Sequence, residues 1–347
     1  MRRALVAAAV VAGVLLAAMV AGFFWASSGF DDTDPLGVRP ERIDGVADRA
    51  GDAPPDKLRV VTWNIAYGRG WKDDAGDLRS EPVVRANLAA IARALRDLDA
   101  DIVALQEVDY DAARSHRIDE LRFLAREAGY PWAARVETWR CRYVPYPYWP
   151  PSQHYGRVVS GQAVLSRFPI RSAVRRLLPQ PPNPFWYNAF YLHRAAQIAE
   201  IDLGAGRTVN VVNVHLEAFH QANREEQAGL LVGMVRPLLG NPTIVLGDMN
   251  GIPPEAGLRA RFPDEPDTDM TADRTIAVLR DGLGFGEAVD PAAYRADPAS
   301  ASTFPAHAPN RTLDHLFFSP HFRRMAGRVA HDAGMLSDHL PVLADLD

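Results

Sequence analysis

Short runs of β-branched and apolar residues recur along the chain, and many of them end in a carboxylate, an amide or an imidazole. Runs of this length and composition are typical of buried strands. We expect strands over residues 58–65, 101–108, 161–166, 196–202, 208–216, 242–247, 312–319 and 340–346. The polar residues at or near the edges of these runs are Asn64, Glu107, His215, Asp248, Asn250, Asp314 and His339. Strands of one sandwich can deliver such side chains to a single rim of the fold.

Segments with helical periodicity lie between some of these predicted strands. Residues 81–98 and 221–239 carry apolar side chains every three or four positions, which predicts two helices that each bury one face. Residues 196–202 and 208–216 flank a glycine-containing turn and are expected to pair as a hairpin. The chain therefore belongs to the α/β (α+β) class, and residues 58–347 are enough for one domain.

A long apolar segment at the amino terminus predicts a membrane helix. Residues 4–25 carry no charge and follow Arg2 and Arg3. At about 1.5 Å per residue this segment spans roughly 33 Å, which is enough to cross a bilayer core. We expect residues 1–26 to be an uncleaved single-pass anchor in the cell membrane, with the rest of the chain outside the cytoplasm because the positive end stays inside. The alternative is a cleaved signal segment, which would make the protein secreted.

Residues 27–57 are expected to be a flexible linker between this segment and the domain. They are rich in Asp, Gly and Pro and lack periodic apolar residues. A segment of this composition buries too little apolar surface to offset the entropy of ordering it. The predicted organisation is therefore a membrane segment over 1–26, a linker over 27–57 and a folded domain over 58–347.

Charge and cysteine content narrow the range of functions. The net charge is -5, whereas proteins that bind long nucleic acids through the phosphate backbone usually have a net positive charge. A local basic groove remains compatible with this charge. The single cysteine, Cys141, excludes an intrachain disulfide framework and a zinc site built on several cysteines.

Six motifs occur in a fixed order within the predicted domain. They are TWNI (62–65), LQEV (105–108), NVHLE (213–217), GDMN (247–250), RTLDHLFFS (311–319) and SDHLPV (337–342). Together they resemble the endonuclease/exonuclease/phosphatase superfamily, which includes pancreatic-type deoxyribonucleases, abasic-site endonucleases, inositol-phosphate 5-phosphatases and neutral sphingomyelinases. The resemblance implies a four-layered sandwich of two mixed β-sheets flanked by helices. It also implies a Mg2+-dependent phosphodiesterase or related hydrolase, with Mn2+ as the alternative ion.

The resemblance assigns metal binding to three residues. Glu107 matches the Mg2+-binding glutamate, and Asn64 matches the asparagine beside the metal. Asp338 matches a carboxylate that binds metal or steers the neighbouring histidine. A hard divalent cation favours carboxylate oxygens and retains several waters, so these residue types suit the implied ion.

The resemblance assigns catalysis to five residues. Asp248 matches the aspartate that positions or deprotonates the attacking water, and Asn250 matches the partner that holds this aspartate and a phosphate oxygen. His215 and His339 match histidines that act on phosphoryl oxygens. Asp314 matches the aspartate that pairs with a catalytic histidine.

Two further residues are candidates for substrate binding. Tyr155 matches the family's phosphate-contacting tyrosine, and Arg194 is one of several arginines that can supply a positively charged groove. Tyr155 ends the first of two aromatic, proline-rich stretches, residues 139–155 and 179–191, which we expect to be loops at the rim of the site. Their Tyr and Trp side chains suit a bilayer–water interface, and packing over the sandwich is the alternative.

Several functions remain open. The favoured function is a tethered phosphodiesterase that acts outside the cytoplasm on phospholipid head groups. It is favoured by the membrane segment, the acidic net charge and the aromatic stretches. The segment TWNIAYGRG (62–70) also favours it, because it resembles lipid- and sphingomyelinase-like members of the family. The alternatives are an extracytoplasmic Mg2+-dependent nuclease on DNA or RNA, a non-catalytic binding module, and a phosphomonoesterase of sugars or inositols. The expected partners are a phosphodiester substrate and the membrane, and no protein partner is inferred.

Overall fold

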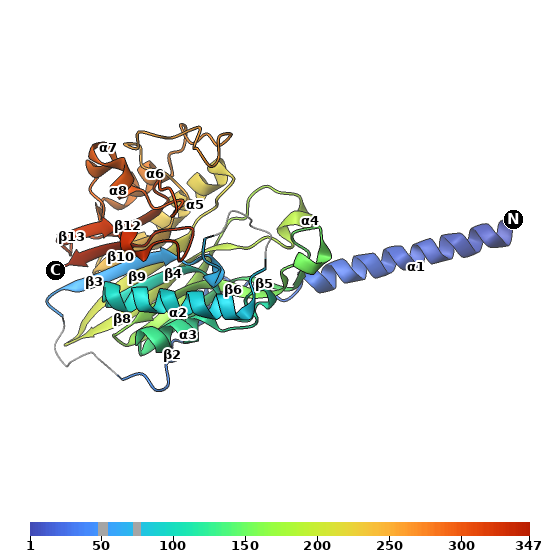
Figure 1. Ribbon diagram of the computed structural model, residues 1–347, viewed down its shortest axis with the longest axis horizontal. Helices are drawn as coiled ribbons and strands as arrows, with labels where there is room; N and C mark the ends of the chain where they lie inside the picture. Colours follow the sequence, from blue (N-terminus) through green and yellow to red (C-terminus); the bar gives the residue numbers. More distant parts are fainter. Residues whose placement is uncertain (48–54, 72–77) are drawn as a thin grey trace.

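The computed structural model, which describes residues 1–47, 55–71 and 78–347, contains two seven-stranded β-sheets stacked face to face with helices outside (Figure 1). The core between the sheets contains Val60 and Ile102 from one sheet and Ile244 and Leu246 from the other, all fully buried. The sequence therefore predicted the four-layered sandwich correctly.

The first sheet is mixed, with one parallel pair of strands. Its order is β13 (Arg324–Val329), β14 (Val342–Leu346), β3 (Leu58–Asn64), β4 (Ile102–Asp109), β6 (Gly156–Ser166), β5 (Trp132–Val144) and β2 (Glu41–Arg42). Strands β3 and β4 run parallel, because helix α2 (Glu81–Leu98) crosses over between them. The apolar face of α2 packs on this sheet, as its periodicity predicts.

The second sheet repeats this plan. Its order is β1 (Leu36–Val38), β7 (Ile170–Leu178), β8 (Arg194–Gly204), β9 (Arg207–His215), β10 (Thr243–Asp248), β12 (Asp314–Phe318) and β11 (Gly286–Glu287). Strands β9 and β10 run parallel across the helix α5 (Gln221–Val235). The predicted hairpin is confirmed, since β8 and β9 pair antiparallel.

The remaining helices are short, apart from the amino-terminal one. They are α1 (Arg2–Ser27), α3 (Glu120–Ala128), α4 (Phe185–Asn188), α6 (Thr275–Leu283), α7 (Ala293–Ala296) and α8 (Pro298–Ala301). Single 3-10 turns occur at η1 (Ala66–Gly68), η2 (Ala113–Ser115), η3 (Pro151–Gln153), η4 (Arg236–Leu238) and η5 (His331–Ala333). The helix expected over 221–239 ends at Val235, and the following turn contains Pro237, which lacks the N–H needed to continue a helix.

Helix α1 projects away from the sandwich, and none of its residues is buried (Figure 1). By length and composition it is able to cross a membrane, and an amino-terminal signal sequence has the same properties. Its carboxyl end lies beside α4, whereas the carboxyl terminus of the chain lies at the opposite end of the molecule (Figure 1).

The segment that follows α1 differs from the flexible linker expected over 27–57. Strand β1 pairs antiparallel with β7, strand β2 pairs with β5, and Ile43 is buried in the core under the first sheet. Edge strands are held by backbone hydrogen bonds and need few apolar side chains, so composition alone did not reveal them. Residues 48–54, the rest of the expected linker before Pro55, lie outside the described residues.

The first aromatic stretch is also different from the prediction. Residues 139–144 are not a rim loop but the end of β5, paired with β6. Trp139 and Cys141 are buried there, and the first proline of the stretch, Pro145, follows immediately after the strand. A loop remains over residues 145–155, because proline cannot donate to the sheet ladder.

Candidate active site

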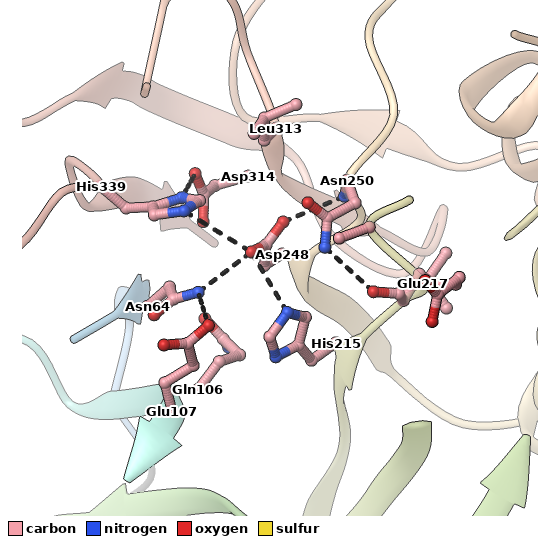
Figure 2. A network of polar contacts seen from close by, with 12 residues as sticks. Asn64, Gln106, Glu107, His215, Glu217, Asp248, Asn250, Leu313, Asp314 and His339 are labelled. Atoms are coloured by element: carbon pink, nitrogen blue, oxygen red, sulfur yellow. Dashed lines mark hydrogen bonds and ion pairs between the residues drawn. The ribbon is translucent and has the colours of Figure 1, made fainter. Parts of the chain in front are cut away.

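Three neighbouring strands of the second sheet place carboxylate and imidazole groups at one edge. Asp248, the last residue of β10, is the register partner of both His215 on β9 and Asp314 on β12. From the first sheet, Asn64 at the end of β3 donates from Nδ2 to Oδ2 of Asp248 at 3.0 Å. The site therefore bridges the two sheets at the ends of their strands (Figure 2).

Asp248 is the centre of the polar network (Figure 2). Its Oδ1 accepts the backbone N–H of Asn250 at 3.0 Å, and its Oδ2 lies 3.5 Å from Nε2 of His215 and 3.7 Å from Nε2 of His339. Burial raises the pKa of Asp248 to about 7, although the positive charge of His339 and the Asn64 hydrogen bond oppose the rise. A carboxylate with this pKa is suited to exchanging a proton near neutral pH.

His339 is held by a second buried carboxylate. Its Nδ1–H donates to Oδ2 of Asp314 at 2.8 Å, and its backbone carbonyl accepts the indole N–H of Trp63 at 2.9 Å. Burial alone opposes a charge on this imidazole, but Asp314 and Asp248 outweigh it and raise the pKa of His339 well above its ordinary value. His339 is therefore a charged donor whose Nε2 faces Asp248.

His215 has the opposite electrostatic character. Burial, together with the nearby charges of Arg194 and His339, lowers its pKa well below the ordinary value. A neutral imidazole at this position can donate one hydrogen bond without adding charge. The two histidines therefore offer one neutral and one charged group to the same carboxylate.

Glu107 and Asp338 form a separate acidic pair in the same cavity. Glu107 sits at a bulge in β4 with a φ of +53°, and its Oε1 accepts from Nδ2 of Asn64 at 3.3 Å. Burial raises the pKa of Glu107, and the charge of Asp338 raises it further. Asn64, Glu107 and Asp338 are carboxylate and amide residues of the types that a hard divalent cation favours, and the two carboxylates line one cavity.

A second grouping, Asp248 with Asp314 and His339, also brings ligand-type atoms within 4.8 Å of one another. We favour a hydrogen-bonded role for this group, because Nδ1 of His339 already donates to Asp314.

Asn250 contributes through its backbone. Its N–H is the group that contacts Asp248, while its side-chain Nδ2 donates to the carbonyl of Leu216 at 2.9 Å. Its φ of +48° and the φ of +143° at Gly247 give the GDMN turn its shape. The turn therefore fixes the position of Asp248.

Gly247→Ala is expected to lower the free energy of unfolding by about 3 kcal/mol, because a Cβ at this φ would clash with the backbone of Val214. Chemical denaturation measures the change. Gly229→Ala in α5, where a Cβ meets nothing within 4 Å, is the control and should be neutral or slightly stabilising. Equal stability of the Gly247→Ala variant and the wild type would contradict the assigned role of this turn.

Arg194 and Tyr155, the predicted substrate-binding residues, both line the cavity. Arg194 is buried, its Nε lies 3.4 Å from Glu217, and its Nη2 donates to the hydroxyl of Tyr191 at 3.3 Å. Among the described residues its buried Nη1 has no hydrogen-bond partner, which leaves a charged donor for an anion. Tyr155 packs against the guanidinium of Arg114, 4.9 Å from the ring centre.

Two buried arginine–carboxylate pairs of this region were not predicted. Glu217 lies within the NVHLE motif, so the sequence did carry a signal for the Arg194–Glu217 pair. Arg114 pairs with Asp109 at 2.9 Å and stacks on the ring of Tyr67 at 3.5 Å. No motif points to Arg114, because the rings that surround its guanidinium, Tyr67, Trp139 and Tyr155, come from other parts of the sequence.

Two stacked mixed sheets, with a cluster of carboxylates, imidazoles and an amide where their strands end, define a hydrolase fold. The model of the Endonuclease/Exonuclease/phosphatase family matches residues 61–339. The chain belongs to this family, whose members are generally phosphoester hydrolases. The comparison with curated proteins gives no match.

Solved structures with the same fold cover most of this chain. An endonuclease/exonuclease/phosphatase from Beutenbergia cavernae DSM 12333 is 24% identical, with a TM-score of 0.61 over 84% of this chain and 71% of its own. The catalytic domain of human Nocturnin with a bound sulfate anion is 20% identical, with a TM-score of 0.54 over 86% of this chain and 96% of its own. The mannosyl-6-phosphatase Bt3783 of Bacteroides thetaiotaomicron VPI-5482 is 16% identical, with a TM-score of 0.53 over 84% and 99%.

Proposed function

We propose that the chain is a membrane-tethered, metal-dependent phosphodiesterase that acts outside the cytoplasm on phospholipid head groups or similar phosphodiesters. The proposal rests on one observation: the Asp248 cluster lies in a cavity of about 580 Å3 that is lined by many aromatic side chains. This volume is within the usual range for small-molecule sites. Phe190, which lines the cavity, also contacts Phe23 of α1 with ring centres 5.3 Å apart.

Asn64, Glu107 and Asp338 are the residues that would hold Mg2+, with Mn2+ as the alternative. When bound, such an ion neutralises charge on phosphoryl oxygens and stabilises the leaving oxygen. The fit rests on the carboxylates of Glu107 and Asp338, which line the same cavity, where burial and then the charge of Asp338 raise the pKa of Glu107.

The catalytic roles follow from the polarity of each group. Asp248 takes a proton from the attacking water, whose oxygen forms a new bond to phosphorus while the bond to the leaving oxygen breaks. His339, charged and oriented by Asp314, supplies a proton or a hydrogen bond to a phosphoryl or leaving oxygen. Neutral His215 and Nη1 of Arg194 donate to the remaining phosphoryl oxygens.

Arg194→Lys is expected to lower kcat/KM by about 10- to 100-fold, because a lysine keeps the charge but loses the free Nη1 donor, and a hydrogen bond to a charged group contributes about 1.5–3 kcal/mol. Steady-state kinetics on a soluble phosphodiester measure the change. Arg207→Lys, at an exposed position in β9, is the matched control. An unchanged kcat/KM in the Arg194→Lys variant would remove this residue from the binding site.

The membrane topology is part of the same proposal. Helix α1 has its two arginines at the amino end, which favours an anchor whose amino terminus faces the cytoplasm. The anchor would comprise residues 1–26, and the catalytic domain would comprise residues 58–347 together with strands β1 and β2. Cleavage after α1 would instead release the domain as a secreted enzyme.

Nuclease activity is the second candidate, because the cavity also carries basic side chains. They are Arg69, Arg114, Arg194 and Arg311. The test incubates the purified full chain and Mg2+ with mixed phospholipid vesicles and, in parallel, with plasmid DNA. Head-group release is expected, and nicking of plasmid without lipid hydrolysis would favour the nuclease. Inactivity on both would contradict the phosphodiesterase proposal and direct attention to phosphomonoesters.

A further inference from the structure

A loop and the short helix α4, both beside the cavity, expose large aromatic side chains. Residues 145–155 present Tyr148 and Trp149, and α4 presents Phe185 and Trp186. Trp149 is 79% exposed and Phe185 is 74% exposed. We call these four residues the aromatic rim. Monomeric soluble proteins rarely expose a cluster of such side chains that binds no partner, so the aromatic rim indicates an interaction surface.

The aromatic rim is continuous with the mouth of the active-site cavity. Tyr148 from the loop and Trp186 from α4 line the cavity that also contains Asp248. Tyr187, next to Trp186, lines it as well. A surface that contacts the rim therefore also faces the entrance of the site.

The carboxyl end of α1 is packed against the same region (Figure 1). The ring of Phe23 lies 6.1 Å from that of Phe185 and 5.3 Å from that of Phe190, edge to face in both cases. The thiol of Cys141, on β5, donates to the carbonyl of Ser27 at 3.9 Å. The helix therefore meets the domain at the rim.

The residues after α1 continue this attachment without a free spacer. Gly29 forms an antiparallel bridge with Cys141, and the ring of Phe30 stacks on that of His193 at 3.9 Å. The guanidinium of Arg175 donates to the backbone carbonyls of Asp31 and Thr33. The direction of α1 relative to the cavity is therefore set by packing and hydrogen bonds.

These contacts fix where a bilayer lies if α1 spans it. The apolar part of α1 ends at Trp25, two residues after Phe23, which contacts Phe185 of the rim. The rim is thus at the level at which α1 leaves the hydrocarbon, which is where Trp and Tyr partition most favourably.

We propose that the aromatic rim rests on the same bilayer that α1 spans, so that the cavity takes a phospholipid head group directly from that membrane surface. The membrane contact follows from α1 and the rim alone. The choice of a phospholipid as the substrate rests on the proposed function of the previous section. Both parts are tested with the full chain reconstituted into vesicles.

The first experiment measures quenching of tryptophan fluorescence by phospholipids with brominated acyl chains. Trp149→Phe is expected to remove part of the quenchable emission. Trp132→Phe is the matched control, because Trp132 begins β5 at the end of the strand away from the rim and should leave quenching unchanged. Equal quenching in the wild type and the Trp149→Phe variant would overturn rim docking, whatever the enzymatic activity.

The second experiment uncouples α1 from the domain by inserting twelve Gly/Ser residues between Ser28 and Gly29. Hydrolysis of vesicle phospholipid is expected to fall about tenfold because the cavity is no longer held at the surface, while hydrolysis of soluble bis(4-nitrophenyl) phosphate stays unchanged. Equal activity on vesicles before and after insertion would overturn the orienting role of α1. Quenching at Trp149 without any hydrolysis of vesicle phospholipid would overturn the lipid substrate and leave the docking surface in place.

Discussion

Replacing Asp248 with asparagine is expected to lower phosphoester hydrolysis by about 1000-fold while the domain stays folded. Asparagine keeps the shape of the side chain and can still accept the N–H of Asn250. It cannot take a proton from water, and it removes the negative charge that faces Nε2 of both His215 and His339.

Steady-state turnover of a soluble phosphodiester measures the effect, with circular dichroism and thermal unfolding as checks of the fold. The control is Asp281→Asn, which changes the same residue type at an exposed position of α6. Turnover at the wild-type rate in the Asp248→Asn variant would remove Asp248 from the catalytic step. A variant that fails to fold is replaced by Asp248→Glu, which retains the charge but displaces it.

His339→Ala is expected to reduce hydrolysis by about 100- to 1000-fold, because it removes a charged donor from the cavity. Asp314→Asn should reduce it less, since the imidazole remains but loses the carboxylate that raises its pKa. The pH dependence of the rate distinguishes the two variants, because only Asp314→Asn leaves a titrating imidazole with a lowered pKa.

The control for these variants is His321→Ala, which changes an exposed histidine after β12. It should leave the rate unchanged. An Asp314→Asn variant with the pH profile of the wild type would contradict the role of Asp314 in raising the pKa of His339. In that case the 2.8 Å hydrogen bond between them would have only a structural role.

The sequence predicted the elements of the site better than their mutual arrangement. Asn64 and Asp248 were identifiable because each ends a run of apolar, β-branched residues at a strand end. The pairing of Asp248 with His215 and Asp314 depends on the register of β9, β10 and β12, which is set by long-range backbone hydrogen bonds. The family resemblance supplied those roles, and local patterns did not.

Other features were missed for physical reasons. The ends of β5 and the strands within residues 27–57 are stabilised by edge pairing, so their composition resembles that of loops and linkers. The attachment of α1 to the rim depends on ring contacts between Phe23 and α4, which lie far apart in the sequence. The burial of Arg114 likewise depends on the ring of Tyr67, which comes from another part of the sequence.

The most direct test of the central claim is the rate of phosphodiester hydrolysis as a function of free Mg2+, in the wild type and in Glu107→Gln. The account predicts that chelation with EDTA abolishes activity, that Mg2+ restores it in the wild type, and that Glu107→Gln needs much more Mg2+ or stays inactive. Glu127→Gln, at an exposed position in the last turn of α3, should behave like the wild type. Full activity in EDTA, or equal Mg2+ activation of Glu107→Gln and the wild type, would contradict a metal-dependent phosphodiesterase with Glu107 as a ligand.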